Sequence, residues 1–206
     1  MLKSFKIEAK TIEEAEKKAV ELLSLPLEKI TLNVISEKRG LLGFKTVTTY
    51  EALPNINLAL EGKRYLEGIF QGLGIEIKME MRTKEDNSSI KYDIYSEENA
   101  LLIGSEGRTL RSIQMLLRTY LNSFTKEPIL VNIDIGNYNK NRKKQLEILA
   151  TKTAKEVAQT KIEARLEPMN SFERRIIHTK LSEWRDVKTE SIGEGEDRQV
   201  VIKPVK

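Results

Sequence analysis

Two short groups of residues in this 206-residue sequence have the types and spacing needed to bind a phosphate backbone. The tetrad Gly104-Ser-Glu-Gly107 precedes Arg108 and Arg111. Two glycines let a phosphodiester come close to a loop, and the helix that follows has free N–H groups there. Farther along, Arg174 and His178 are four residues apart and share one helix face. An arginine fork with a mostly neutral imidazole offers phosphate hydrogen bonds and a ring for stacking, which favours nucleic-acid binding.

Each of these signals has a plain structural alternative. The middle positions of the tetrad are Ser105 and Glu106, and an exposed carboxylate beside a phosphate costs about 0.5–1 kcal/mol. This predicts weaker binding than a basic loop gives, or a loop used for protein contacts. For His178, the alternative is a structural histidine that fastens its helix to the strands that follow.

The composition argues against catalysis. The chain has no cysteine and one histidine, which excludes a disulfide scaffold, cysteine zinc sites and a thiol nucleophile, and argues against a zinc hydrolase. The acids are scattered and form no group of acid, base and nucleophile. We therefore expect no enzyme activity, no metal site and no cofactor. The sequence has no apolar run near the ~18–20 residues of a membrane span and does not start like a signal peptide, so a cytoplasmic location is expected.

The first 52 residues predict a small β-α-β-β domain. A strand over 3–9 precedes a helix that Thr11 caps, and strands follow over 30–36 and 44–52. The segment between the last two strands is apolar for a turn, since it contains Leu41, Leu42 and Phe44. Either this tip folds back on the helix, or it is a docking surface for another protein.

Residues 53–136 predict an αββααβ order after a short linker at 53–57. Helices are expected over 58–72, 97–103 and 108–124, and strands over 75–83, 89–96 and 128–135. At 100° per residue, the helix over 108–124 has one broad apolar face. Arg108, Arg111 and Arg118 lie together on a different, narrow face, which is either available to an anion or an ordinary solvated face.

Residues 137–206 carry 16 basic and 11 acidic residues, a net charge of +5, so this third is expected to meet a polyanion. A long helix is predicted over 139–166. Lys143 and Lys144 lie in its first turn, where the helix dipole disfavours cations, which indicates either a nearby anion or lysines that are simply solvated. Asn170 then caps a helix that contains Arg174, Arg175 and His178. Two short strands, over 186–192 and 198–203, complete this domain.

Three stretches of this sequence resemble known domains. The αββααβ order around the tetrad is similar to a KH domain of the second topological type, which clamps about four nucleotides of a single strand; its middle loop positions are often basic, unlike Ser105 and Glu106. The Arg174-to-His178 spacing and the tail over 191–204 resemble an R-three-H domain. Residues 38–45 resemble the glycine-phenylalanine motif of the Jag N-terminal domain. The chain therefore resembles the Jag (KhpB or EloR) family over essentially its whole length.

This resemblance implies an α+β chain of three small domains and a bacterial regulator of cell elongation and division that binds single-stranded RNA, with single-stranded DNA as a second candidate. It also implies a small single-KH partner protein and contact with a membrane insertase or cell-wall machinery, and it implies no small-molecule substrate. The alternative is a protein-interaction adaptor whose nucleic-acid binding is weak or incidental. The expected nucleic-acid-binding residues are Gly104, Ser105, Glu106, Gly107, Arg108, Arg111, Arg118, Lys143, Lys144, Arg174, Arg175 and His178.

Overall fold

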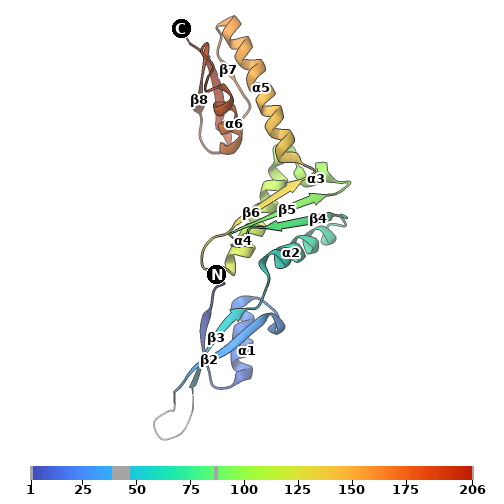
Figure 1. The fold of residues 1–206 in the computed structure, drawn as a ribbon, viewed down its shortest axis with the longest axis vertical. Helices are drawn as coiled ribbons and strands as arrows, with labels where there is room; N and C mark the ends of the chain where they lie inside the picture. The colour runs from blue at the N-terminus through green and yellow to red at the C-terminus, as the bar shows by residue number, and fades with distance from the viewer. Residues whose placement is uncertain (1, 39–46, 86–87, 206) are drawn as a thin grey trace. The chain divides into compact units, whose positions relative to one another are not determined.

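The computed structural model describes residues 2–38, 47–85 and 88–205. The chain divides into two compact units, Met1–Gly136 and Asn137–Lys206. Figure 1 shows their helices and strands in order. Within the described residues, no helix is both long enough and apolar enough to cross a membrane.

The first unit begins with a helix packed on a small antiparallel sheet, as the β-α-β-β prediction requires. Its elements are β1 (Phe5–Ala9), α1 (Ile12–Leu23), the 3-10 turn η1 (Leu27–Lys29), β2 (Ile30–Lys38) and β3 (Val47–Pro54). The strand order is β1-β3-β2. Buried Ala15, Ala19 and Leu23 form the inner side of α1. Strand β3 extends two residues into the expected linker, because Leu53 and Pro54 pair with β2.

The rest of the first unit has the predicted αββααβ order. Its elements are α2 (Leu58–Gly72), β4 (Lys78–Thr83), β5 (Ser89–Tyr95), α3 (Asn99–Ile103), the 3-10 turn η2 (Ser105–Gly107), α4 (Arg108–Ser123) and β6 (Leu130–Ile135). The sheet order is β4-β5-β6, with β4 antiparallel and β6 parallel to the central strand. Helices α2 and α4 pack against each other and against the sheet (Figure 1). The apolar face predicted for α4 is buried, with Leu110, Ile113, Leu117 and Leu121 inside.

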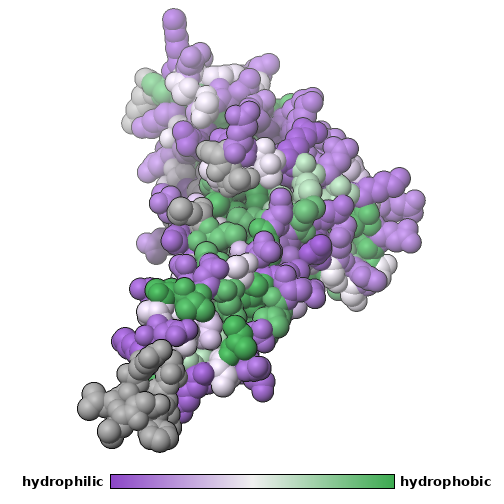
Figure 2. All heavy atoms as spheres, turned by 60° about the horizontal axis from the view of Figure 1, so that its bottom comes forward, coloured by the Kyte–Doolittle hydropathy of each residue, from purple (hydrophilic) through white to green (hydrophobic). Residues whose placement is uncertain are grey.

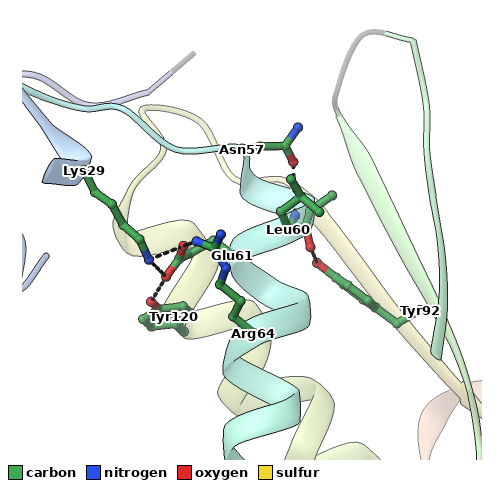
Figure 3. A network of polar contacts seen from close by, with 8 residues as sticks. Lys29, Asn57, Leu60, Glu61, Arg64, Tyr92 and Tyr120 are labelled. Atoms are coloured by element: carbon green, nitrogen blue, oxygen red, sulfur yellow. Dashed lines mark hydrogen bonds and ion pairs between the residues drawn. The ribbon is translucent and has the colours of Figure 1, made fainter. Parts of the chain in front are cut away.

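These two parts of the first unit share a core and a polar network. Phe124, which follows α4, packs in one apolar cluster with Ile7, Leu23 and Ala52. Beside this cluster, the Glu61 carboxylate accepts hydrogen bonds from Lys29 Nζ at 2.8 and 3.0 Å and from the Tyr120 hydroxyl at 3.0 Å (Figure 3). The 1–52 and 53–136 segments therefore belong to one compact unit.

The charge state of this network follows from its contacts. Burial disfavours ionisation of Glu61, but the hydrogen bonds from Lys29 and Tyr120 outweigh it and hold the Glu61 pKa below its usual value. Burial and the neighbouring Glu61 carboxylate raise the pKa of Tyr120 to about 12. At neutral pH the carboxylate is charged and the phenol is protonated, which suits the hydrogen bonds that the structure shows.

The second unit packs two helices on a three-stranded sheet. Its elements are α5 (Tyr138–Thr160), β7 (Ala164–Arg165), α6 (Ser171–Leu181), β8 (Val187–Ile192), the 3-10 turn η3 (Gly195–Asp197) and β9 (Gln199–Pro204). The strand order is β7-β9-β8. The prediction of a helix to residue 166 was wrong, because Lys161 adopts a left-handed conformation (φ 59°) that ends α5. Ala164 and Arg165 then pair with β9.

Candidate nucleic-acid interface

The GxxG tetrad makes a sharp turn between α3 and α4 that depends on both glycines. Gly104 has φ 70° and ψ 179°, a conformation that residues with a side chain hardly adopt. A Cβ at this position would lie 2.2 Å from Thr109 Oγ1. Gly107 also has positive φ (75°), and its N–H donates to the Gly104 carbonyl at 3.2 Å. The loop therefore lets a phosphate come close to its backbone, as a phosphate-binding turn must.

The start of α4 is the positive end of this surface. Gly107 is the N-cap of α4 and supplies no side-chain cap, so the first-turn N–H groups have no capping side chain. Glu106 is left-handed as well (φ 52°), and its carbonyl accepts a 2.7 Å hydrogen bond from Arg111 Nη1. The Arg108 and Arg111 side chains are exposed. Two cations thus lie where they can offset the acidic side chain of Glu106.

The arginine face of α4 also contains an apolar residue that the sequence reasoning missed. Arg118 is exposed on the same face as Arg108 and Arg111. Met115 falls between these arginines at 100° per residue, and its side chain is 71% exposed. The same angular reading of the sequence could have found it. A flexible thioether among arginines gives this face a contact for a base or another apolar group.

In the second unit, Arg174 and His178 lie together on α6, but the histidine is engaged by protein groups. His178 Nδ1 lies 2.6 Å from Thr189 Oγ1, and Nε2 lies 2.9 Å from Ser191 Oγ. Burial, with a smaller effect from the Arg174 charge, lowers the His178 pKa. The imidazole is therefore neutral at pH 7 and holds α6 to β8, which is the structural alternative considered for it.

Thr189 and Ser191 were not foreseen as part of this site. They are two residues apart on β8 and so point to the same side of the strand, but pairs of hydroxyl residues at this spacing are common in strands and do not by themselves indicate a histidine partner. Arg174 Nε donates to the Met169 carbonyl at 3.2 Å. Among the described residues, no hydrogen bond or ion pair to its terminal nitrogens is found. The terminal fork of Arg174 can therefore bind an anion.

The remaining predicted cations divide between two locations. Arg175 is 100° from Arg174 around α6 and lines a hollow between α5 and α6 with Lys143. Lys144 lines a neighbouring hollow on α5. The structure therefore brings Lys143, Lys144 and Arg175 to two hollows that His178 does not line.

One cation near the start of α5 has a structural role. Arg142 Nε forms a 2.7 Å ion pair with Glu173 Oε1, and the Glu173 side chain is only 5% exposed. Glu173 Oε2 also accepts from the Asn170 N–H at 3.3 Å, which completes the predicted capping box of α6. This pair joins the two helices of the second unit.

Two of the expectations concern protein docking and metal binding. The predicted docking tip falls outside the described residues, because it consists of Leu41, Leu42 and Phe44. Within the described ranges, no cluster of three or more His, Asp or Glu residues could hold a metal ion.

Family models match three consecutive stretches of the chain. The model described as Jag N-terminus matches residues 7–48, and the model described as KhpA/KhpB, KH domain matches residues 63–135. The model of the R-three-H domain matches residues 144–204.

Curated relatives match most of the chain. It is 35% identical over 198 residues to the RNA-binding protein KhpB of Bacillus subtilis, which covers 94% of each chain. It is 33% identical over 200 residues to the RNA-binding protein KhpB of Clostridium symbiosum, which covers 95% of this chain and 89% of the relative. The RNA-binding protein KhpB of Streptococcus pneumoniae is 27% identical over 78% of this chain and 48% of that relative.

Proposed function

The chain belongs to the KhpB family, and on that premise we propose that it is a non-enzymatic regulator that binds single-stranded RNA. The family assignment confirms the resemblance drawn from the motifs. The observation that carries the proposal is the glycine-dependent turn at Gly104 and Gly107, placed at the uncapped start of α4. Backbone N–H groups at such a turn bind phosphate oxygens without regard to base identity.

In the first unit, an unpaired strand would run over the GxxG turn. Its phosphates would meet the first-turn N–H groups of α4 and the side chains of Arg108 and Arg111. The hydrogen bond from Arg111 to the Glu106 carbonyl fixes part of that guanidinium before RNA arrives. The exposed Met115 would contact a base. Glu106 lowers the affinity of this surface, so we expect it to bind weakly alone.

In the second unit, Arg174 would bind phosphate, and His178 would act as a positioning residue. The hydrogen bond to the Met169 carbonyl orients the guanidinium of Arg174, which leaves its terminal nitrogens for a bidentate contact. Two weak sites on one chain reinforce each other, because binding at one raises the effective concentration at the other.

The test is the affinity of the full chain for a labelled single-stranded RNA of mixed sequence, measured by fluorescence anisotropy. Arg174→Gln should weaken binding about tenfold, and Arg185→Gln, which removes the same charge from another exposed position of the second unit, should change it less than twofold. The slope of log affinity against log salt should be near −0.7 for each of roughly four to six phosphate contacts. Equal losses in the two variants, or a flat salt dependence, would refute the proposal.

A second candidate function is that of a protein adaptor, and one surface of the first unit favours it. Strand β2 lies at the edge of its sheet, where Val34 and Ile35 are exposed. Figure 2 shows hydrophobic side chains gathered among hydrophilic ones on the face that comes forward in that view. An exposed strand edge with apolar side chains can pair with another chain.

The two candidates separate at Glu106. In RNA binding, Glu106→Lys should tighten the complex, because it removes a repulsive carboxylate and adds a cation. In an adaptor whose tetrad packs on a small single-KH partner, the same change should weaken capture of that partner. The proposed regulator would act in the bacterial cytoplasm on cell elongation and division, and it would contact a membrane insertase or cell-wall machinery.

A further inference from the structure

The second unit has a groove between α5 and α6 that the family motifs do not include. It consists of two hollows of about 490 and 500 Å³. Glu147 and Lys180 line both of them, so the hollows adjoin. We name this surface the α5–α6 groove. Its lining residues are Lys143, Lys144, Glu147, Ile148, Thr151, Lys152, Lys155, Phe172, Arg175, Ile176, Thr179, Lys180, Ser182 and Glu183.

The charge of the α5–α6 groove is strongly positive. Six of its lining residues are Lys or Arg and two are Glu, a local net charge of +4. Glu147 lies 3.8 Å from Lys143. In the described part of the chain, no ion pair involves Lys144, Lys152 or Lys155. Cations that crowd one hollow without acidic partners raise its potential and attract a polyanion.

The cations follow a line along α5. Lys144, Lys152 and Lys155 recur at spacings that keep them near one helix face. With a rise of 1.5 Å per residue, Lys144 and Lys155 are about 16 Å apart along the axis. Stacked nucleotides advance roughly 3.4 Å each, so this line could meet the phosphates of several successive nucleotides.

The groove also offers an aromatic surface to a base. The Phe172 side chain is 65% exposed and lines the same hollow as Arg175. Ile148 lines the adjoining hollow and is exposed as well. Cationic side chains beside an exposed aromatic ring are the arrangement that binds single strands without sequence preference. A duplex would keep its bases stacked on each other, so an unpaired strand fits this combination better.

We propose that the α5–α6 groove is a second single-stranded RNA surface of the second unit, separate from the Arg174 fork. Lys144, Lys152 and Lys155 contact phosphates, and Phe172 stacks on a base. Arg175 belongs to this surface and not to the one formed by Arg174, its neighbour in sequence. The inference rests on the proposed function, because it adds a surface to the same RNA-binding role.

The test removes the groove charge from the full chain and measures the salt dependence of binding to single-stranded RNA. The groove variant replaces Lys144, Lys152 and Lys155 with Gln. A control variant removes the same charge from exposed positions of the second unit outside the groove, namely Lys161, Lys188 and Arg198. We expect the groove variant to bind on the order of tenfold more weakly and to lose about 2 from the magnitude of the salt slope, at ~0.7 per contact. The control variant should keep the parent slope.

A second pair of variants tests stacking. Phe172→Leu keeps an apolar side chain and removes the ring, so it should weaken binding roughly fivefold or more. Phe172→Trp keeps a ring, should preserve the affinity, and should show fluorescence quenching by RNA beyond that of Trp184 in the parent.

The outcomes separate the two claims. If the parent chain does not bind single-stranded RNA, the proposed function fails. If the parent binds but the groove and control variants have the same slope, the groove inference alone fails, and an acidic protein segment becomes the occupant to test. Unchanged RNA affinity in Phe172→Leu would show that Phe172 does not stack on a base.

Discussion

Gly104→Ala tests whether the tetrad has the backbone geometry on which KH-type binding depends. At φ 70° and ψ 179°, an alanine costs about 1–3 kcal/mol in backbone strain. Its Cβ would also lie 2.2 Å from Thr109 Oγ1, 2.9 Å from Thr109 Cβ and 3.1 Å from the Thr109 backbone nitrogen. The hydroxyl can rotate away, but the backbone cannot move without shifting the start of α4. We therefore expect a total cost of ~3 kcal/mol, below the ~5–15 kcal/mol that keeps a domain folded.

Gly74→Ala is the matched control. Gly74 also has φ 70°, but nothing lies within 4 Å of the position that its Cβ would occupy. That variant should lose only ~1–2 kcal/mol of stability, which is the cost of placing a residue with a side chain at positive φ. The difference between the two variants combines the contact with Thr109 and the added strain of ψ 179° at Gly104.

The assay uses the single tryptophan of the chain as an internal reference. Trp184 lies in the second unit, so its fluorescence in urea follows that unit, whereas far-UV circular dichroism follows both. Gly104→Ala should shift the dichroism transition and leave the Trp184 transition unchanged. It should also weaken RNA binding, whereas Gly74→Ala should not. Equal destabilisation by the two alanines, or unchanged RNA affinity in Gly104→Ala, would refute this account of the tetrad.

Three further predictions concern groups inside the units. Glu61→Gln leaves Lys29 without its counter-charge and should destabilise the first unit by ~2 kcal/mol in urea unfolding. Because the Glu61 pKa is lowered in the folded chain, the stability of the first unit should fall as pH drops from 4.5 through the folded pKa, and it should fall less in the variant. Because the His178 pKa is lowered, the second unit should lose stability as pH falls below 6.5, and His178→Gln should remove that dependence of the Trp184 transition. Gly62→Ala would place a Cβ 2.1 Å from the hydroxyl of the buried Tyr92, so it should cost ~2 kcal/mol or more by dichroism, and an unchanged midpoint would contradict the packing of α2.

The elements could be predicted from the sequence where the local signals agree. In α4, the apolar positions recur at helical spacing, and the structure buries them while it exposes Arg108 and Arg111. The start of α6 combines Asn170 with Glu173, and both hydrogen bonds of the capping box form. These elements are specified by neighbours three or four residues apart, which a single sequence displays directly.

The end of α5 could not be predicted in this way. Residues after Thr160 continue a weak helical pattern, but pairing of Ala164 and Arg165 with β9 competes with it. That pairing joins residues almost 40 positions apart, so no window of neighbouring residues contains it. Tertiary pairing therefore overrides local preference at this point.

The arrangement of the candidate site residues could not be predicted for the same reason, because tertiary packing decides which surface each one faces. Arg174 and Arg175 are adjacent and equally charged, and the sequence gives no reason to separate them. The fold separates them, because one faces the side of α6 where Met169 and His178 lie, and the other lines the α5–α6 groove. A helix turns 100° per residue, so neighbouring cations can contact two different stretches of one RNA strand. If the two arginines contribute to separate surfaces, their single losses in binding free energy should add in the double variant, whereas residues that share one phosphate should show a coupling of about 0.5–3 kcal/mol.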